Sequence, residues 1–150
     1  NCPGQIVITG EAAAVAEAGT ALKEAGARRV LPLKVSGPFH SPMMRPAGEE
    51  LAKVFAGVSM NPLKIPYVAN INAEVITDCG RIEGLLVEQV SGSVRWQQSV
   101  ETMIREGVDT FVEIGPGKTL TGFLRKIDKN VKAYHIGSWE EAVQVCEELK

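Results

Sequence analysis

The sequence carries little net charge, no long apolar run and no paired cysteines. Its formal net charge is −2, so it has no excess of positive charge to neutralise a nucleic-acid backbone or an anionic membrane surface. Its longest apolar runs, such as Gln5–Thr9 and Phe111–Ile114, are far shorter than the roughly 20 residues that a membrane-spanning helix needs. These absences argue against a nucleic-acid partner and against a membrane partner.

The three cysteines, Cys2, Cys79 and Cys146, stand far apart in the chain. Their number is odd and none belongs to a C-x-x-C pair, so neither a disulfide framework nor a zinc site is expected, and a reducing cytoplasm is the simplest compartment. The N-terminal Asn-Cys-Pro-Gly is not typical of a secretory signal, because no basic stretch is followed by an apolar one. The absence of an initiating Met suggests that the chain starts inside a larger protein.

At 150 residues, with 45% hydrophobic and 23% charged residues, the chain has the size and composition of a soluble globular domain or two small subdomains. Gln5–Gly10 is typical of a short strand, and Glu11–Ala25 has Leu and Val at helical spacing up to Gly26. Arg29–Val35 follows as a second strand, in which Pro32 indicates an edge position or a bulge. Together these segments predict a βαβ-like unit.

The rest of the chain alternates in the same way. Ser36–Pro46 is rich in proline and predicts a rigid loop that leads into a helix, with Ser41 as its N-cap and Pro42 as its first residue, ending at Gly57. Thr110–Ile114 is expected to be a buried strand. An α/β fold follows from this alternation. The further strands expected are Pro66–Asn70, Ala73–Thr77 and Ala133–Ile136, and the further helices are Ile82–Val90, Trp96–Glu106, Lys118–Ile127 and Trp139–Leu149.

Gly117-Lys118-Thr119 lies between a predicted strand and a predicted helix, as the end of a phosphate-binding loop would. That motif needs a glycine five residues before Gly117, where this chain has Val112. A tight structural turn is therefore the preferred interpretation. His135, in a predicted strand with no carboxylate or cysteine at ligand spacing, is interpreted as structural.

His40 stands in the proline-bounded loop between Phe39 and Ser41, where a fixed backbone can hold an imidazole in one orientation. A general base needs such fixing, although a plain loop histidine fits the spacing equally well. A serine nucleophile in an α/β fold usually sits in a G-x-S-x-G turn. No serine of this chain has glycine at both positions, so the chain offers a candidate base without a nucleophile.

In their order along the chain, these residues resemble the C-terminal half of the malonyl-CoA:acyl carrier protein transacylases and of the acyltransferase domains of fatty acid and polyketide synthases. Each motif is weak alone, whereas their combined order is specific. The matching landmarks are Asn1–Gly10, Val35–Ser41, Met44, Pro46, Asn70, Val94–Trp96, Ser99-Val100, Glu113–Gly117 and Leu120.

The resemblance implies a Ser-His dyad on an α/β-hydrolase-like subdomain, to which residues 37–150 would belong, and a small ferredoxin-like subdomain that includes residues 1–36. The serine takes malonyl from malonyl-CoA and passes it to the phosphopantetheine thiol of acyl carrier protein by a ping-pong transfer. His40 matches the family's base, and Gln89 matches the residue whose backbone carbonyl orients the base. Asn1 matches a residue beside the active-site cleft. No permanently bound cofactor is implied, because the coenzyme A thioester is a substrate.

The same resemblance links Phe39 to a preference for malonyl over methylmalonyl, although Phe39 could also be a core residue that anchors the loop. The family's serine, the arginine that pairs with the malonyl carboxylate and the oxyanion hole lie in the N-terminal half, which this chain lacks. The chain alone is therefore expected to be inactive. A non-catalytic module that binds or scaffolds the carrier protein is the alternative, and a hydrolase of the same fold is a weaker one.

Overall fold

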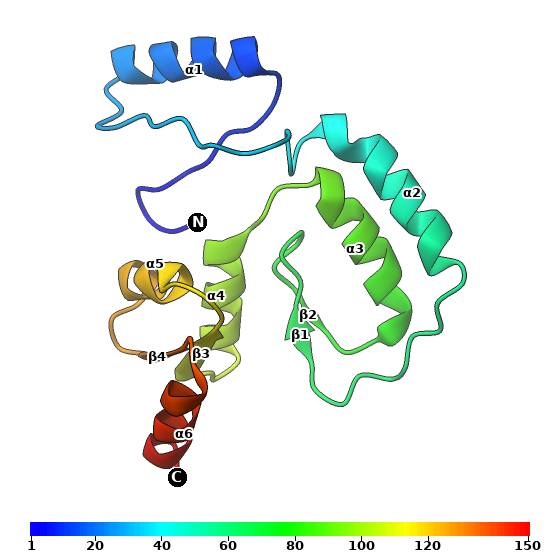
Figure 1. Cartoon of the computed structure of the whole chain (residues 1–150), viewed down its shortest axis with the longest axis vertical. Helices are drawn as coiled ribbons and strands as arrows, with labels where there is room; N and C mark the ends of the chain where they lie inside the picture. Colours follow the sequence, from blue (N-terminus) through cyan, green and yellow to red (C-terminus); the bar gives the residue numbers. More distant parts are fainter.

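Helices and short strands share the chain in the computed structural model, which describes residues 1–150 (Figure 1). The class is α/β, as predicted. The helices are α1 (Ala12–Glu24), α2 (Arg45–Phe55), α3 (Ile82–Ser91), α4 (Trp96–Arg105), α5 (Thr119–Ile127) and α6 (Trp139–Glu148). The strands are β1 (Tyr67–Val68), β2 (Val75–Ile76), β3 (Thr110–Ile114) and β4 (Lys132–Ile136). None of the helices combines the length and apolar character needed to cross a membrane.

The strands form two separate two-stranded sheets. β1 and β2 make an antiparallel hairpin in which Tyr67 lies opposite Ile76. β3 and β4 are parallel, with Thr110 opposite Lys132 and Ile114 opposite Ile136. Because parallel neighbours need a crossover connection, α5 crosses between them. This β3–α5–β4 unit was predicted from the sequence to within a residue or two at each end.

Helices α2 and α3 lie side by side on one flank of the molecule (Figure 1). Gly48 of α2 permits this packing, because a Cβ at that position would lie 3.1 Å from the backbone oxygen of Val87 in α3. The same packing brings the loop in front of α2 next to the C-terminal end of α3.

The two strands expected on either side of α1 are not formed, so that part of the βαβ prediction is wrong for this chain. A strand exists only where another strand accepts its backbone hydrogen bonds, and residues 6–9 and 29–35 have no such partner. Their apolar side chains stay exposed: Ile6 by 87% and Val35 by 65%. The chain does fold back against the helix, and the contact is close: a Cβ on Gly19 would lie 3.3 Å from Val30 Cγ1.

The expectation that Thr110–Ile114 is a buried strand is also wrong. Side chains alternate between the two faces of a strand. One face of β3 carries Val112 and Ile114, which are 37% and 78% exposed, while Glu113 on the other face contacts α5. A two-stranded sheet with its helices on one side leaves its second face open.

The N-terminus of α5 is capped by the carboxylate of Glu113. Its Oε1 accepts from the N–H of Leu120 at 3.0 Å, and its Oε2 accepts from the N–H and hydroxyl of Thr121 at 2.7 and 2.6 Å. The carboxylate takes the position that a phosphate would take at a helix N-terminus. Gly115 and Gly117, at φ 140° and 84°, shape the turn before the helix. The turn is therefore structural, in agreement with the interpretation from the sequence.

Replacing Glu113 with glutamine is expected to destabilise the fold by about 1 kcal/mol at neutral pH, because the helix loses a charged cap. Burial raises the pKa of Glu113, but the hydrogen bonds from Thr121 and Leu120 and the charge of His135 outweigh it, so the net pKa is lowered. The contribution of a carboxylate with a lowered pKa is present above its unfolded value, about 4.3, and is lost as the pH falls through the folded value. Urea unfolding over an acid pH series should show the difference between variant and wild type shrinking, whereas Glu49→Gln, at an exposed site, should show no such trend.

Candidate active site

The loop that carries His40 is held in an unusual backbone conformation. His40 has φ 60°, a left-handed value that a residue with a side chain rarely adopts unless its surroundings enforce it. The buried Ser41 fixes the loop by donating its hydroxyl to the carbonyl of Pro38 at 2.7 Å. Ser41 was predicted as a helix N-cap, and it does precede the 3₁₀ turn Pro42–Met44, but its side chain makes no cap hydrogen bond. Its hydroxyl tightens the histidine loop instead.

The exposed imidazole of His40 contacts the backbone of a residue 49 positions away. His40 Nδ1 lies 3.1 Å from the carbonyl oxygen of Gln89, near the end of α3. Because a carbonyl oxygen can only accept, Nδ1 must carry the ring proton in the neutral form. The lone pair is then on Nε2. The structure thus brings His40 and Gln89 together in the arrangement of an oriented general base.

The side chain of Gln89 helps to fix the C-terminal end of α3. Its Nε2 donates to the carbonyl of Gly92 at 3.1 Å. Nε2 also lies 3.4 Å from His40 Nδ1, but with Nδ1 protonated both atoms are donors, so that approach is not a hydrogen bond. Gly92 is the C-cap of α3, and its N–H bonds back to the carbonyl of Glu88. The carbonyl that faces His40 is therefore part of a helix end that is fixed from both sides.

Gly92→Ala is expected to disturb this end of α3. An added Cβ would lie 2.1 Å from Ile71 Cδ1 and 2.9 Å from the carbonyl oxygen of Glu88, so either the end of α3 or Ile71 must move. Overpacking of this kind typically costs about 1–3 kcal/mol. We expect lower stability in chemical unfolding of the intact protein. Gly84→Ala, on the same helix with nothing within 4 Å of the added Cβ, is the control, and equal effects of the two substitutions would contradict this account.

Phe39 and Asn1 differ in their relation to His40. Phe39 directly precedes His40 and is 48% exposed, so within this chain it is not a core residue. Asn1 is half-buried at the start of the chain, and no hydrogen bond joins it to His40. The chain therefore provides one assembled contact, between His40 and Gln89, with Phe39 beside it.

His135 is tied into the β4 region, as the structural interpretation expects. Its Nε2 lies 2.9 Å from the carbonyl oxygen of Gly115. A carboxylate that was not expected from the sequence faces its other nitrogen: Oε2 of Glu141, on the following helix, lies 3.4 Å from Nδ1. No group of three or more histidine, cysteine or acidic side chains is arranged to hold a metal ion.

The candidate base His40 has no nucleophile beside it in this chain. No serine, threonine or cysteine side chain forms a hydrogen bond to His40, and the neighbouring Ser41 hydroxyl is engaged by Pro38. Enzymes of α/β fold that transfer or hydrolyse acyl groups pair such a histidine with a serine nucleophile. By itself, the histidine can accept and return a proton.

Comparison with known proteins shows which acyl-transfer enzymes this chain is similar to. No family model matches it. The malonyl CoA-acyl carrier protein transacylase of Bacillus subtilis (strain 168) is 42% identical over 150 residues, which are 100% of this chain and 47% of that protein. The transacylase of Staphylococcus aureus (strain COL) is 42% identical over 141 residues, 94% of this chain and 46% of that protein.

Solved structures similar to this chain are also transacylases. The crystal structure of MCAT from Streptococcus pneumoniae matches with a TM-score of 0.87 at 42% identity, over 93% of this chain and 45% of the other. A structure described as a type II PKS acyl-carrier protein in complex with its malonyl-transacylase matches with a TM-score of 0.89 at 37% identity. The match covers 93% of this chain and 45% of the other.

The resemblance drawn from the motifs is confirmed: the chain is homologous to the malonyl CoA-acyl carrier protein transacylases. It spans about half the length of the relatives that it matches.

Proposed function

We propose that this chain is the part of a malonyl-CoA:acyl carrier protein transacylase that supplies the histidine base, in fatty acid or polyketide biosynthesis. The observation that carries the proposal is the 3.1 Å contact between His40 Nδ1 and the carbonyl oxygen of Gln89. That contact fixes the tautomer and leaves Nε2 free to take a proton. The similarity to transacylases over the whole chain supports acyl transfer as the reaction that this base would serve.

In this mechanism the serine nucleophile lies outside the chain. His40 Nε2 takes the proton of the serine hydroxyl as its oxygen attacks the malonyl thioester carbon, and the imidazolium returns that proton to the departing coenzyme A thiol. The phosphopantetheine thiol of the carrier protein then gives its proton to Nε2 and attacks the malonyl-serine ester. As the ester bond breaks, Nε2 returns the proton to the serine oxygen, which restores both the serine and the neutral histidine. The Gln89 carbonyl stabilises the imidazolium, in the role that an aspartate has in Ser-His-Asp triads.

The proposal also divides the chain into two parts. Residues 1–36 belong to a small ferredoxin-like subdomain, and residues 37–150 form the C-terminal part of an α/β-hydrolase-like subdomain. Support comes from α1, which stands apart from the other helices (Figure 1), and from the unpaired apolar segments on either side of it. Asn1 and Phe39 are proposed to line the substrate cleft, and the N-terminal half of the enzyme is proposed to cover the open face of β3.

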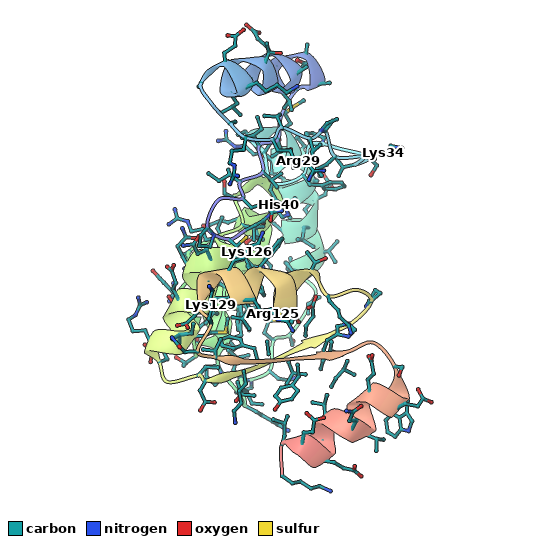
Figure 2. All side chains as sticks on the ribbon, turned by 90° about the vertical axis from the view of Figure 1, so that its left-hand side faces the viewer. Arg29, Lys34, His40, Arg125, Lys126 and Lys129 are labelled. Atoms are coloured by element: carbon teal, nitrogen blue, oxygen red, sulfur yellow. The ribbon has the colours of Figure 1, made fainter.

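Acyl carrier protein and malonyl-CoA are the proposed partners. A homologous transacylase has been solved with its carrier protein. Both substrates carry phosphate, and positive side chains near a site raise the rate at which an anionic partner arrives. Figure 2 shows Lys126, Lys129 and Arg125, at and just after the end of α5, on the side of the molecule from which His40 is also seen.

One observation favours a second function. The chain has no serine in a G-x-S-x-G turn and no nucleophile bonded to His40, as a non-catalytic module that binds or scaffolds the carrier protein would. In that case the protein would bind the carrier protein without loading it.

The deciding experiment uses the intact protein that contains this chain, mixed with malonyl-CoA and phosphopantetheinylated carrier protein. We expect the mass of the carrier protein to rise by one malonyl group. Residues 1–150 alone should give no rise, because they lack the nucleophile. Binding without loading would favour the scaffold, and release of free malonate without loading would favour a hydrolase.

A further inference from the structure

The two ring nitrogens of His135 face two acceptor groups, which a neutral imidazole cannot satisfy together. The side chain is only 10% exposed, on β4. Its Nε2 lies 2.9 Å from the carbonyl oxygen of Gly115, in the turn before α5. Since a carbonyl only accepts, Nε2 must carry a proton. A neutral ring then has its lone pair on Nδ1.

That second nitrogen faces a carboxylate. His135 Nδ1 lies 3.4 Å from Glu141 Oε2 and has no hydrogen-bond partner, although it is buried. A lone pair against a carboxylate oxygen is repulsive, because both groups are acceptors. A second proton, on Nδ1, converts the contact into an attraction between opposite charges.

The carboxylate is held in place. Glu141 Oε2 also accepts from the N–H of Gly137 at 2.6 Å. This bond holds the pKa of Glu141 below its usual value; burial opposes the shift, and the charges of His135 and Lys118 add to it. Gly137 leaves room for the pair, since a Cβ there would lie 2.8 Å from His135 Cε1 and 3.3 Å from Glu141 Oε2.

The surroundings contain charges of both signs. Glu113 on β3 is the register partner of His135, and the charge of His135 helps to lower the pKa of Glu113. A cleft of about 240 Å³ opens beside the ring. The other charged or titratable side chains that line it are Lys118 before α5, Arg125 on α5, Tyr134 on β4 and Glu148 on α6.

We propose that His135 and Glu141 form a proton-dependent latch that fastens α6 to β4 and to the turn before α5. With both ring nitrogens protonated, His135 joins Gly115 on one side and Glu141 on the other. When the pH rises and the Nδ1 proton leaves, the contact becomes repulsive and α6 loosens. The polar contacts of His135 do not include His40 or Gln89, and the latch does not depend on the proposed reaction.

The test is hydrogen exchange of the α6 amides in the intact protein over a pH series, corrected for intrinsic exchange, with the ring nitrogens of His135 followed by NMR. We expect protection of α6 to fall roughly fivefold as Nδ1 loses its proton, the effect of a contact of about 1 kcal/mol. Glu141→Gln, whose amide oxygen can still accept from Gly137, should abolish that step. Glu148→Gln, on the same helix and cleft, should retain it.

Two results would overturn the latch. One is a wild-type His135 that keeps a proton only on Nε2 over the whole series, with constant protection of α6, as a water-bound neutral ring would show. The other is a step of the same size in Glu141→Gln. The wild-type series decides the first point even if the variant folds poorly.

Discussion

His40→Ala in the intact protein is expected, on the proposed mechanism, to lower acyl transfer by roughly 10²- to 10⁴-fold, the loss typical of removing a positioned general base. In the proposed mechanism the imidazole is the group that takes the proton of the serine and of the incoming thiol, so its removal slows both half-reactions. The measurement is kcat/KM for transfer from malonyl-CoA to the carrier protein. Burst kinetics would show whether acylation of the serine is among the slowed steps.

The matched control is the other histidine. His135→Ala should leave kcat/KM nearly unchanged when assayed well below the unfolding temperature, because the polar contacts of His135 are with Gly115 and Glu141 and not with His40 or Gln89. Equal losses in the two variants would mean that the base has been assigned to the wrong histidine. A normal rate for His40→Ala would remove the basis of the proposed mechanism.

The elements that could be predicted from the sequence are those whose stabilising contacts are local. Helices such as α1 and α5 have apolar residues at helical spacing and glycine or proline at their ends, so their residue types are enough to place them. The β3–α5–β4 unit followed from one strand, a glycine turn and a helix in order. The position of His40 in a fixed loop followed from the prolines around it.

The features that could not be predicted depend on partners distant in the sequence. Residues 5–10 and 29–35 have the composition of strands, but strand pairing depends on hydrogen bonds that this chain does not supply. The Glu113 cap joins residues seven and eight positions apart across a turn, and spacing alone gives no sign of it. The carbonyl that faces His40 belongs to the backbone, and any residue type at position 89 would supply it. Residue types therefore do not indicate this contact, and Gln89 was predicted from the family resemblance alone.

The residue before the base gives the second large effect. If the intact protein has the proposed activity and Phe39 lines the proposed cleft, Phe39→Ser is expected to shift the ratio of kcat/KM for malonyl-CoA and methylmalonyl-CoA toward methylmalonyl. The ring of Phe39 stands next to His40 and is half exposed in this chain, so it is free to line the space that an α-methyl group would enter. One methyl group is worth about 1–3 kcal/mol of discrimination, or roughly 10- to 200-fold in the ratio.

The competing account is packing, in which Phe39 only anchors the histidine loop. The two accounts predict different kinetics, because a misplaced loop slows both substrates alike and leaves their ratio unchanged, whereas a removed steric block favours the branched substrate. Phe39→Leu, which keeps most of the apolar volume, should retain the malonyl preference, and Met43→Ser, at an exposed neighbouring site, should change neither substrate. If the ratio for Phe39→Ser stays within about twofold of wild type, less than one methyl group should give, Phe39 does not select the acyl group.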